Sequence, residues 1–260
     1  MKMIEDYYLC DASFFERTRV RYQRAKSYGA LFIRRPTFKV PRRILFDGEY
    51  VDLDVPFSEK GVKWAFLDVV IDDVYGLRRL EKDKINTVLD IGANVGFFCL
   101  AARSCFSNAI IHGYEPNRQL EKQLSHQADI SKSKVYFEAV GKENGFVNLE
   151  FGEDSVHTRT SSEQKGSFPQ VAFREAIERL GGKVDLLKID CEGGEWEILD
   201  DVESWKNVDR LTMEYHLFAG DYSHETLLAA LQKIKFKIIA LRKSDDIGMV
   251  YAEREDLHSA

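Results

Sequence analysis

The sequence predicts an α/β fold: a mainly parallel β-sheet with helices on both faces and one antiparallel strand. From about residue 85 onward, strand-like runs rich in Val, Ile and Leu alternate with longer runs of helical periodicity, which is the order of βαβ units. The last two strand-like runs, over 235–243 and 248–254, are too close together for a helical crossover. They therefore form a hairpin, which places one antiparallel strand in the sheet.

A segment of different character precedes this pattern. We expect residues 1–80 to form a helix and hairpin extension that packs on the core, and residues 81–260 to form the main domain. The 260 residues are 44% hydrophobic, which is sufficient for one full core. Ser13 and Glu16 have the spacing of a capping box, which predicts a helix over 13–28.

The elements follow from local patterns. Residues 50–55 alternate between apolar and polar, which predicts a hairpin with one solvated face, and a helical stretch follows near 60–80. The main domain is then expected to contain strands over 85–91, 109–115, 134–140, 146–151, 184–190 and 209–218, and helices over 94–106, 117–130, 171–180, 195–202 and 224–234.

The first strand of the main domain runs directly into a glycine turn. The turn has the pattern Asp90-x-Gly92-x-Asn94-x-Gly96. Glycines allow the backbone to turn sharply and approach a ligand, and the helix that follows offers free N–H groups. The spacing differs from the G-x-G-x-x-G of a dinucleotide site. A carboxylate at Asp90 suits a ligand with positive charge, such as the amino acid end of S-adenosylmethionine; a tight turn without a ligand is the alternative.

The second strand ends in an acid. Glu115 follows Asp90 by 25 residues, which leaves room for one helix between the two strands. An acid in this place can accept both ribose hydroxyls of a nucleoside. A helix cap is the plainer interpretation of Glu115, but the glycine turn favours the ribose role.

A cluster of acids lies at 188–199, in KIDCEGGEWEIL. Asp190 ends a buried strand, and we expect it to be functional. For Glu195 and Glu197 we prefer interaction with the N-terminus of the next helix. Cys191 is expected to point to the opposite face and to pack in the core. Gly193 and Gly194 would keep side-chain bulk away from bound ligands.

Lys188 lies inside the same buried strand, where a lysine needs a partner. We predict that it forms an ion pair with Asp90 or Glu214 on a neighbouring strand. Because ligands bind beyond the carboxyl ends of parallel strands, the acids at these ends should face one crevice. Their negative charge would stabilise a bound cation.

Together, VLDIGANVGFF, YEPN, EAVGKENGFVNLEF and DLLKIDCEGGEWEIL resemble the FkbM-type S-adenosylmethionine-dependent methyltransferases. The resemblance runs from about Asp73 to His216. It implies a class I methyltransferase fold, Rossmann-like, with a seven-stranded sheet whose last strand is antiparallel. It also implies methylation of a hydroxyl on a small molecule, often a sugar or a polyketide-type natural product.

Site residues are implied by position. Asp90, Gly92, Asn94 and Gly96 would hold the methionine part of the cofactor, Glu115 the ribose, and the backbone of Glu138, Ala139 and Val140 would flank the adenine. Asp190 and Glu192 would line the reaction centre.

Methyl transfer requires alignment of the acceptor with the methyl group and sulfur, and a hydroxyl acceptor also loses a proton. His216 is the first candidate for the base, followed by Asp190 and Glu192. A magnesium or manganese ion on Asp190, Glu192 and Glu214 is an alternative, but no residue spacing requires it, and no metal site is predicted.

The segment 153–169 has the composition of a mobile lid, with His157 and Arg159 as candidate contacts for the acceptor; an ordinary surface loop is the alternative.

The charge of the chain and its distribution indicate which kinds of partner it could bind. The net charge is −6, yet residues 17–43 contain ten Lys or Arg and no acid. This basic stretch could dock an acidic carrier protein that delivers the acceptor, or could lie against acidic parts of the same molecule. A general nucleic-acid binder is disfavoured, although an RNA- or N-directed methyltransferase stays an alternative, as does a non-catalytic cofactor-binding protein.

No membrane-length apolar run or secretory signal is present, and the four cysteines lack zinc spacing. We therefore expect a cytoplasmic protein with reduced thiols.

Overall fold

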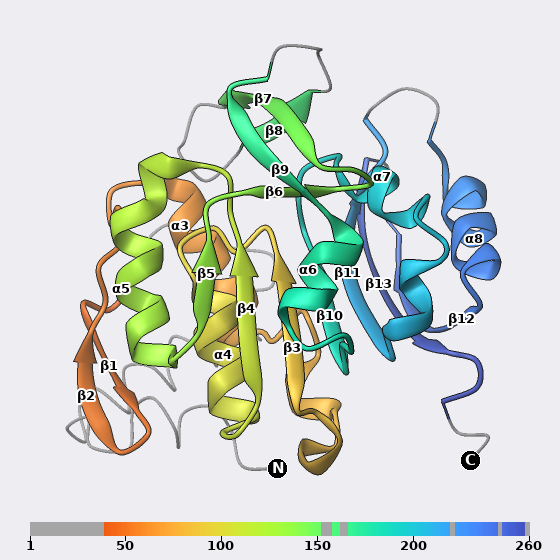
Figure 1. Ribbon diagram of the computed structural model, residues 1–260. Coiled ribbons are helices and arrows are strands. Elements are labelled where there is room, and N and C mark those ends of the chain that lie inside the picture. Colours follow the sequence, from red (N-terminus) through yellow and green to blue (C-terminus); the bar gives the residue numbers. More distant parts are fainter. Residues whose placement is uncertain (1–38, 152–157, 162–165, 219–221, 244–245, 258–260) are drawn as a thin grey trace.

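The computed structural model describes residues 39–151, 158–161, 166–218, 222–243 and 246–257 (Figure 1). Seven strands form the central sheet, in the order β12–β13–β11–β10–β3–β4–β5. Their bounds are Thr87–Ile91 (β3), Ile110–Tyr114 (β4), Lys134–Tyr136 (β5), Leu186–Ile189 (β10), Arg210–His216 (β11), Phe236–Arg242 (β12) and Ile247–Arg254 (β13). β13 is antiparallel to both of its neighbours, whereas the other pairings are parallel. The predicted sheet, with its last strand antiparallel, is confirmed.

Helices cover both faces of this sheet, because strand side chains alternate between the two faces. Leu89 and Ile91 pack in one hydrophobic cluster with helices α6 (Phe173–Arg179), α7 (Glu195–Leu199) and α8 (His224–Lys233). Val88 belongs to another cluster with helix α4 (Phe97–Cys105), and α5 (Glu121–Ser131) packs beside α4. Every described helix is too short or too polar to cross a bilayer.

A second, four-stranded sheet lies beyond the carboxyl ends of the central strands (Figure 1). Its order is β6 (Ala139–Gly141), β9 (Phe168–Ala172), β7 (Gly145–Phe151) and β8 (Thr158–Ser161). Two expectations were therefore wrong. The single strand over 134–140 is divided between two sheets, because β6 pairs with β9 while β5 pairs with β4. The helix expected over 171–180 begins only at Phe173, since the preceding residues belong to β9.

The hairpin of the N-terminal extension is confirmed. Strands β1 (Arg43–Phe46) and β2 (Glu49–Asp52) pair antiparallel around a turn in which Asp47 and Gly48 both have positive φ. Its apolar side packs against Phe97 and Leu100 of α4. The predicted helix over 13–28 lies outside the described residues.

The helix expected near 60–80 is shorter than predicted. It comprises α3 (Lys60–Ala65) and a π-helical segment (Phe66–Ile71). The Asp73 carboxylate then accepts hydrogen bonds from the backbone N–H groups of Leu77 and Arg78, and Gly76 adopts a left-handed conformation, so the chain turns before a new short helix. The short 3₁₀ segments among the described residues are Leu77–Arg79, Lys82–Lys84, Arg118–Leu120 and Ser204–Asn207.

Candidate active site

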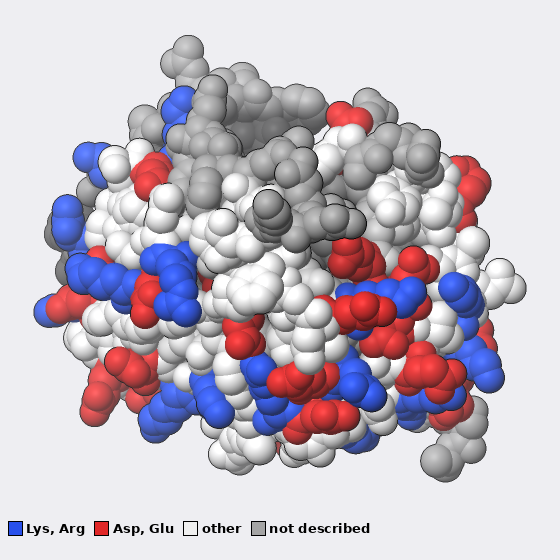
Figure 2. Space-filling view, turned by 45° about the horizontal axis from the view of Figure 1, so that its top comes forward, with Lys and Arg blue, Asp and Glu red and all other residues white. Residues whose placement is uncertain are grey.

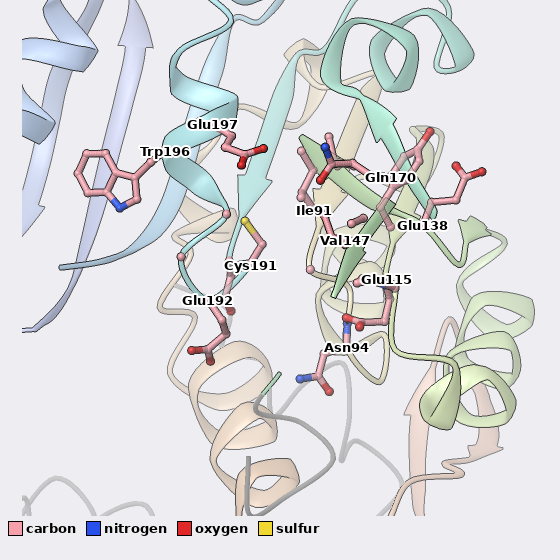
Figure 3. Close-up of a pocket in the computed structure, with 18 of the residues that line it drawn as sticks. Ile91, Asn94, Glu115, Glu138, Val147, Gln170, Cys191, Glu192, Trp196 and Glu197 are labelled. Carbon is pink, nitrogen blue, oxygen red and sulfur yellow. The ribbon is translucent and has the colours of Figure 1, made fainter. Parts of the chain in front are cut away.

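A cavity of about 290 Å³ opens at the carboxyl ends of β3, β4 and β10 (Figure 3), close to the smallest small-molecule pockets, which measure roughly 300 Å³. It is lined by Ile91, Gly92, Asn94, Tyr114, Glu115, Pro116, Leu120, Glu138, Ala139, Val140, Val147, Gln170, Asp190, Cys191, Glu192, Gly193, Gly194, Trp196, Glu197 and Tyr222. Five of these described lining residues are Asp or Glu, and none is Lys or Arg. The cavity therefore presents negative charge to a ligand.

The glycine turn is fixed by the close approach of two strand ends. Gly92 has a φ of +82°, and a Cβ added there would lie 1.7 Å from the backbone oxygen of Asp190. The Asp190 N–H in turn donates to the Ile91 oxygen at 3.0 Å. Only glycine allows the turns after β3 and β10 to touch in this way. This contact brings Asp190 to the same end of the sheet as the glycine turn.

Lys188 holds the two turns together from within the core. Its Nζ lies 3.1 Å from Asp90 Oδ1 and donates to the Gly92 oxygen at 2.6 Å. The predicted ion pair with Asp90 is confirmed. Burial lowers the pKa of Lys188, but the negative charges of Asp90 and Asp190 outweigh that effect and raise it. Lys188 is therefore a cation whose charge is matched inside the protein.

Asp90 differs from expectation. Its side chain is fully buried against Lys188 and the Cys99 thiol and does not line the cavity. Burial raises the pKa of Asp90, and the Lys188 ammonium opposes that rise. Gly96 also lies outside the lining: it precedes α4 with a φ of +86° and packs against Gln127. Of the four residues predicted to hold the methionine part, Gly92 and Asn94 line the cavity.

Glu115 lines the cavity and is itself held in place. Its Oε2 accepts the backbone N–H of Asn94 at 2.9 Å, and its Oε1 accepts that of Asn117 at 2.8 Å. Burial raises the pKa of Glu115 to about 7, although these two N–H groups act in the opposite direction. The carboxylate thus joins the ends of β3 and β4 at the floor of the cavity.

The second sheet contributes an apolar wall. Ala139, Val140 and Val147 line the cavity near the Tyr114 ring, which stacks on Tyr136 with ring centroids 4.7 Å apart.

Glu138 also lines the cavity, and its carboxylate forms an ion pair with Arg179 of α6. Figure 3 shows Glu138 and Gln170 across the cavity from Cys191 and Glu192. Gln170 was not predicted as a site residue, because β9, which carries it, spans the boundary between the segment expected as a lid or loop and the helix expected over 171–180.

Asp190 has a partner that the sequence did not indicate. The hydroxyl of Tyr75, from the N-terminal extension, donates to Asp190 Oδ2 at 2.7 Å. Burial and the charge of Asp190 raise the pKa of Tyr75 well above its usual value, so the phenol keeps its proton and remains a donor. No motif marks Tyr75, which lies 115 residues from Asp190 in the chain.

His216, Asp190 and Glu192 come together, as the prediction of a shared catalytic centre requires. Their ligand atoms all lie within 4.8 Å of one another. His216 is 1% exposed, and its Nδ1 lies 3.1 Å from Glu195 Oε1. Burial lowers the pKa of His216, but contacts with Glu195 and Glu214 raise it to about 11. The imidazole is therefore protonated at neutral pH when no other cation is bound.

Glu195 has a larger role than the helix-end contact expected of it. It is fully buried, accepts the Gly193 N–H at 2.9 Å as a residue at a helix start would, and also holds His216. Cys191 was expected to point away from the site, but it lines the cavity as well as touching the core. Trp196 stacks on Tyr222 with ring centroids 4.0 Å apart, and both residues are part of the cavity lining; the Trp196 ring points away from the cavity (Figure 3).

The expected lid falls largely outside the described residues, His157 included. The described part of that segment contains β8 and the start of β9, which pair with β7, so it is partly sheet and not wholly loop. The acceptor contacts proposed for His157 and Arg159 remain predictions.

Comparison with known proteins identifies the family. Residues 90–238 match the model of the methyltransferase FkbM domain. "Methyltransferase 1" of Beauveria bassiana (strain ARSEF 2860) is 22% identical over 198 residues, which cover 65% of this chain and 79% of the relative. "Methyltransferase sdnD" of Sordaria araneosa is 26% identical over 249 residues, which cover 76% and 92%.

The chain is also similar to solved structures, among them the following two. A crystal structure of Aeropyrum pernix fibrillarin with natively bound S-adenosyl-L-methionine has a TM-score of 0.45 at 14% identity, covering 69% of this chain and 71% of fibrillarin. A precorrin-6y C5,15-methyltransferase from Geobacter metallireducens has a TM-score of 0.43 at 13% identity, with coverage of 70% and 86%. The sheet order and its antiparallel last strand are those of a class I methyltransferase.

Proposed function

This chain belongs to the FkbM methyltransferase family and is an S-adenosylmethionine-dependent methyltransferase, and we propose that it methylates a hydroxyl group of a small molecule. The acceptor class is a sugar or a natural product, which a carrier protein could deliver. The observation that carries the proposal is the described cavity lining, with five Asp or Glu side chains and no Lys or Arg. Such a lining favours the sulfonium cation of the cofactor and an uncharged acceptor, and it repels phosphate.

The cavity walls suggest where each part of the cofactor would bind. Glu115 would accept hydrogen bonds from the ribose hydroxyls. The Gly92 and Asn94 turn would contact the methionine part, while Asp90 supports that turn from behind through Lys188. The adenine would lie against the apolar wall at Ala139 and Val140.

The reaction would be a direct displacement. The acceptor oxygen forms a bond to the methyl carbon, the carbon–sulfur bond breaks, and its electron pair remains on sulfur. Asp190 and Glu192 both lie beside His216 and line the cavity. Because Asp190 already accepts a hydrogen bond from the Tyr75 hydroxyl, we assign the hydroxyl proton to the Glu192 carboxylate. Glu192 therefore replaces His216 as the first candidate for the base. The His216 imidazole already carries a proton at neutral pH and cannot accept another.

The proposal is tested with the full chain and isotopically labelled S-adenosylmethionine. Labelled methyl should pass to members of a panel of glycosides, polyols and phenols, and mass spectrometry should place it on oxygen. A parallel panel of amines and RNA should remain unlabelled. Label on RNA or on nitrogen alone would contradict the proposal, and cofactor binding with no turnover on any substrate would favour the non-catalytic alternative.

The described surface gives no separate support for RNA as the acceptor. In the view of Figure 2, most Lys and Arg side chains of the described residues lie beside Asp or Glu side chains, chiefly in the middle and lower parts of the face shown. The basic stretch 17–43 is described only from residue 39 onward, where Arg43 pairs with Asp52 and Arg42 lies over the Phe57 ring. Carrier docking by this stretch stays a prediction.

A further inference from the structure

We propose that Asp190, Glu192 and His216 form a binding site for one divalent metal ion, of the Mn²⁺ type. This site deepens the proposed function, since it lies where the acceptor hydroxyl would be activated. It stands on the placement of three potential ligands and on the orientation of a buried imidazole.

The three residues come from different parts of the chain. Asp190 and Glu192 follow β10, and His216 ends β11. One ligand atom from each lies within 4.8 Å of the other two. Two ligand atoms bonded to one ion at about 2.0–2.5 Å are at most about 5 Å apart, so this spacing is compatible with a single shared ion. Asp190 and Glu192 also line the cavity, so an ion here would be accessible to a bound acceptor.

The imidazole is aimed at this point. His216 Nδ1 lies 3.1 Å from Glu195 Oε1, and Glu195 is fully buried. Its Nε2 has no hydrogen-bond partner among the described residues, and it lies 3.6 Å from both Glu192 Oε2 and Glu214 Oε1. A carboxylate that orients one ring nitrogen while the other faces the ion is the usual arrangement of a metal-binding histidine.

The donor set indicates the class of ion. Mg²⁺ and Ca²⁺ prefer sites made of oxygen ligands. An imidazole nitrogen beside two carboxylates suits first-row transition metals, of which Mn²⁺ accepts oxygen-rich sites most readily. An ion at Nε2 takes the place of a proton there. The surrounding carboxylates, with Glu214 nearby, compensate its charge.

The ion would change the route of the hydroxyl proton. With the acceptor oxygen as a further ligand, the ion lowers the pKa of the hydroxyl. Glu192 is then an ion ligand, so the proton leaves for solvent instead. Carbon–oxygen bond formation and carbon–sulfur cleavage are unchanged.

The test is Mn²⁺ binding to the full chain, measured by equilibrium dialysis and by electron paramagnetic resonance. We expect one Mn²⁺ per chain, and at least about tenfold weaker binding in Glu192→Gln and His216→Gln. Glu197→Gln, which alters a carboxylate of the same cavity outside the cluster, should bind Mn²⁺ as the wild type does. No bound Mn²⁺, or equal binding by all variants, would overturn the proposal.

A second measurement does not depend on whether His216→Gln folds. Mn²⁺ should raise the melting temperature of the wild type and of Glu197→Gln but not that of Glu192→Gln, whose side chain is 23% exposed. An equal rise in all three would overturn the site. Displacement of Mn²⁺ by equimolar Mg²⁺ would overturn the assigned ion class.

Activity assays separate this inference from the proposed function. Hydroxyl methylation that is lost in chelator and restored by Mn²⁺ supports both. Undiminished methylation in chelator would overturn the role of the ion and leave the proposed function intact. Mn²⁺ binding without methylation of any hydroxyl would contradict the proposed function alone.

Discussion

The buried environment of Glu115 leads to a specific prediction about the pH dependence of cofactor binding. Its pKa of about 7 means that the carboxylate, the better hydrogen-bond acceptor for ribose hydroxyls, forms only as the pH rises through 7. The affinity for S-adenosylmethionine should therefore increase between about pH 6 and pH 8. Glu115→Gln should lose this pH dependence and weaken binding by about 1.5–3 kcal/mol. Calorimetric titrations at several pH values would measure both effects.

The exposed Glu121, which pairs with Arg118, provides the control: Glu121→Gln should keep the pH dependence of cofactor affinity.

The raised pKa of Glu115 also affects the stability of the fold. Native Glu115 holds its proton up to about pH 7, while unfolded glutamate releases it near 4.5. Its contribution to stability is therefore lost as the pH rises from about 4.5 through 7. If Glu115→Gln left the pH dependence of both cofactor affinity and unfolding free energy unchanged, this account of the residue would be refuted.

Lys188 makes a second prediction at the residue scale. Lys188→Met leaves Asp90 buried without its cation, which should cost about 3–5 kcal/mol of unfolding free energy. Cofactor affinity should fall as well, because the Gly92 carbonyl loses its hydrogen-bond donor. Urea denaturation and calorimetry measure the two effects. The double variant Asp90→Asn with Lys188→Met should recover part of the stability, and normal cofactor binding by Lys188→Met would be inconsistent with the supporting role of the pair.

At the scale of elements, the contact between the turns after β3 and β10 is critical. Gly92→Ala places a Cβ against the Asp190 carbonyl, so the turns must separate and cofactor binding should be lost. Gly181→Ala is a matched control: its φ is +109°, but a Cβ there meets nothing within 4 Å. It should cost only the backbone strain, about 1–2 kcal/mol. Cofactor binding by both variants would be compared by calorimetry; equal retention would contradict the contact.

The sequence predicted the elements of the central sheet well because their apolar periodicity is strong and each βα turn is short. It also predicted the Lys188–Asp90 pair, since a lysine in a buried strand requires a neighbouring carboxylate. The second sheet was predicted only in part. β7 corresponds to the strand expected over 146–151, but β6 follows β5 after only two residues, so no local pattern separates these two strands. β9 was missed because Phe168–Ala172 spans the boundary between the expected loop and the expected helix.

The sequence does not show in which direction the side chain of a site residue points. Asp90 and Asp190 both stand near strand ends, yet Asp90 faces Cys99 and Lys188 inside the core, while Asp190 lines the cavity. Residue type and spacing do not distinguish these positions. The sequence does not indicate Tyr75 as a site residue, because its contact with Asp190 spans 115 residues and forms only in the folded chain.

At the scale of the whole molecule, we propose that the extension and the main domain fold as one unit. One hydrophobic cluster contains Ile44 and Phe66 of the extension together with Phe97 of α4, and Tyr75 reaches the site from the same segment. A chain that begins at residue 81 should therefore expose this apolar surface and aggregate. Full-length protein should unfold in one transition by calorimetry; two transitions, or a stable truncated chain, would contradict this.

The central claim is that a negatively charged cavity at the ends of β3, β4 and β10 binds the sulfonium cofactor. Isothermal titration of the full chain with S-adenosylmethionine tests it most directly. The account predicts one site per chain, with weaker binding in Glu115→Gln and none in Gly92→Ala. Absence of heat with both S-adenosylmethionine and its demethylated product, or binding that both substitutions leave unchanged, would contradict it.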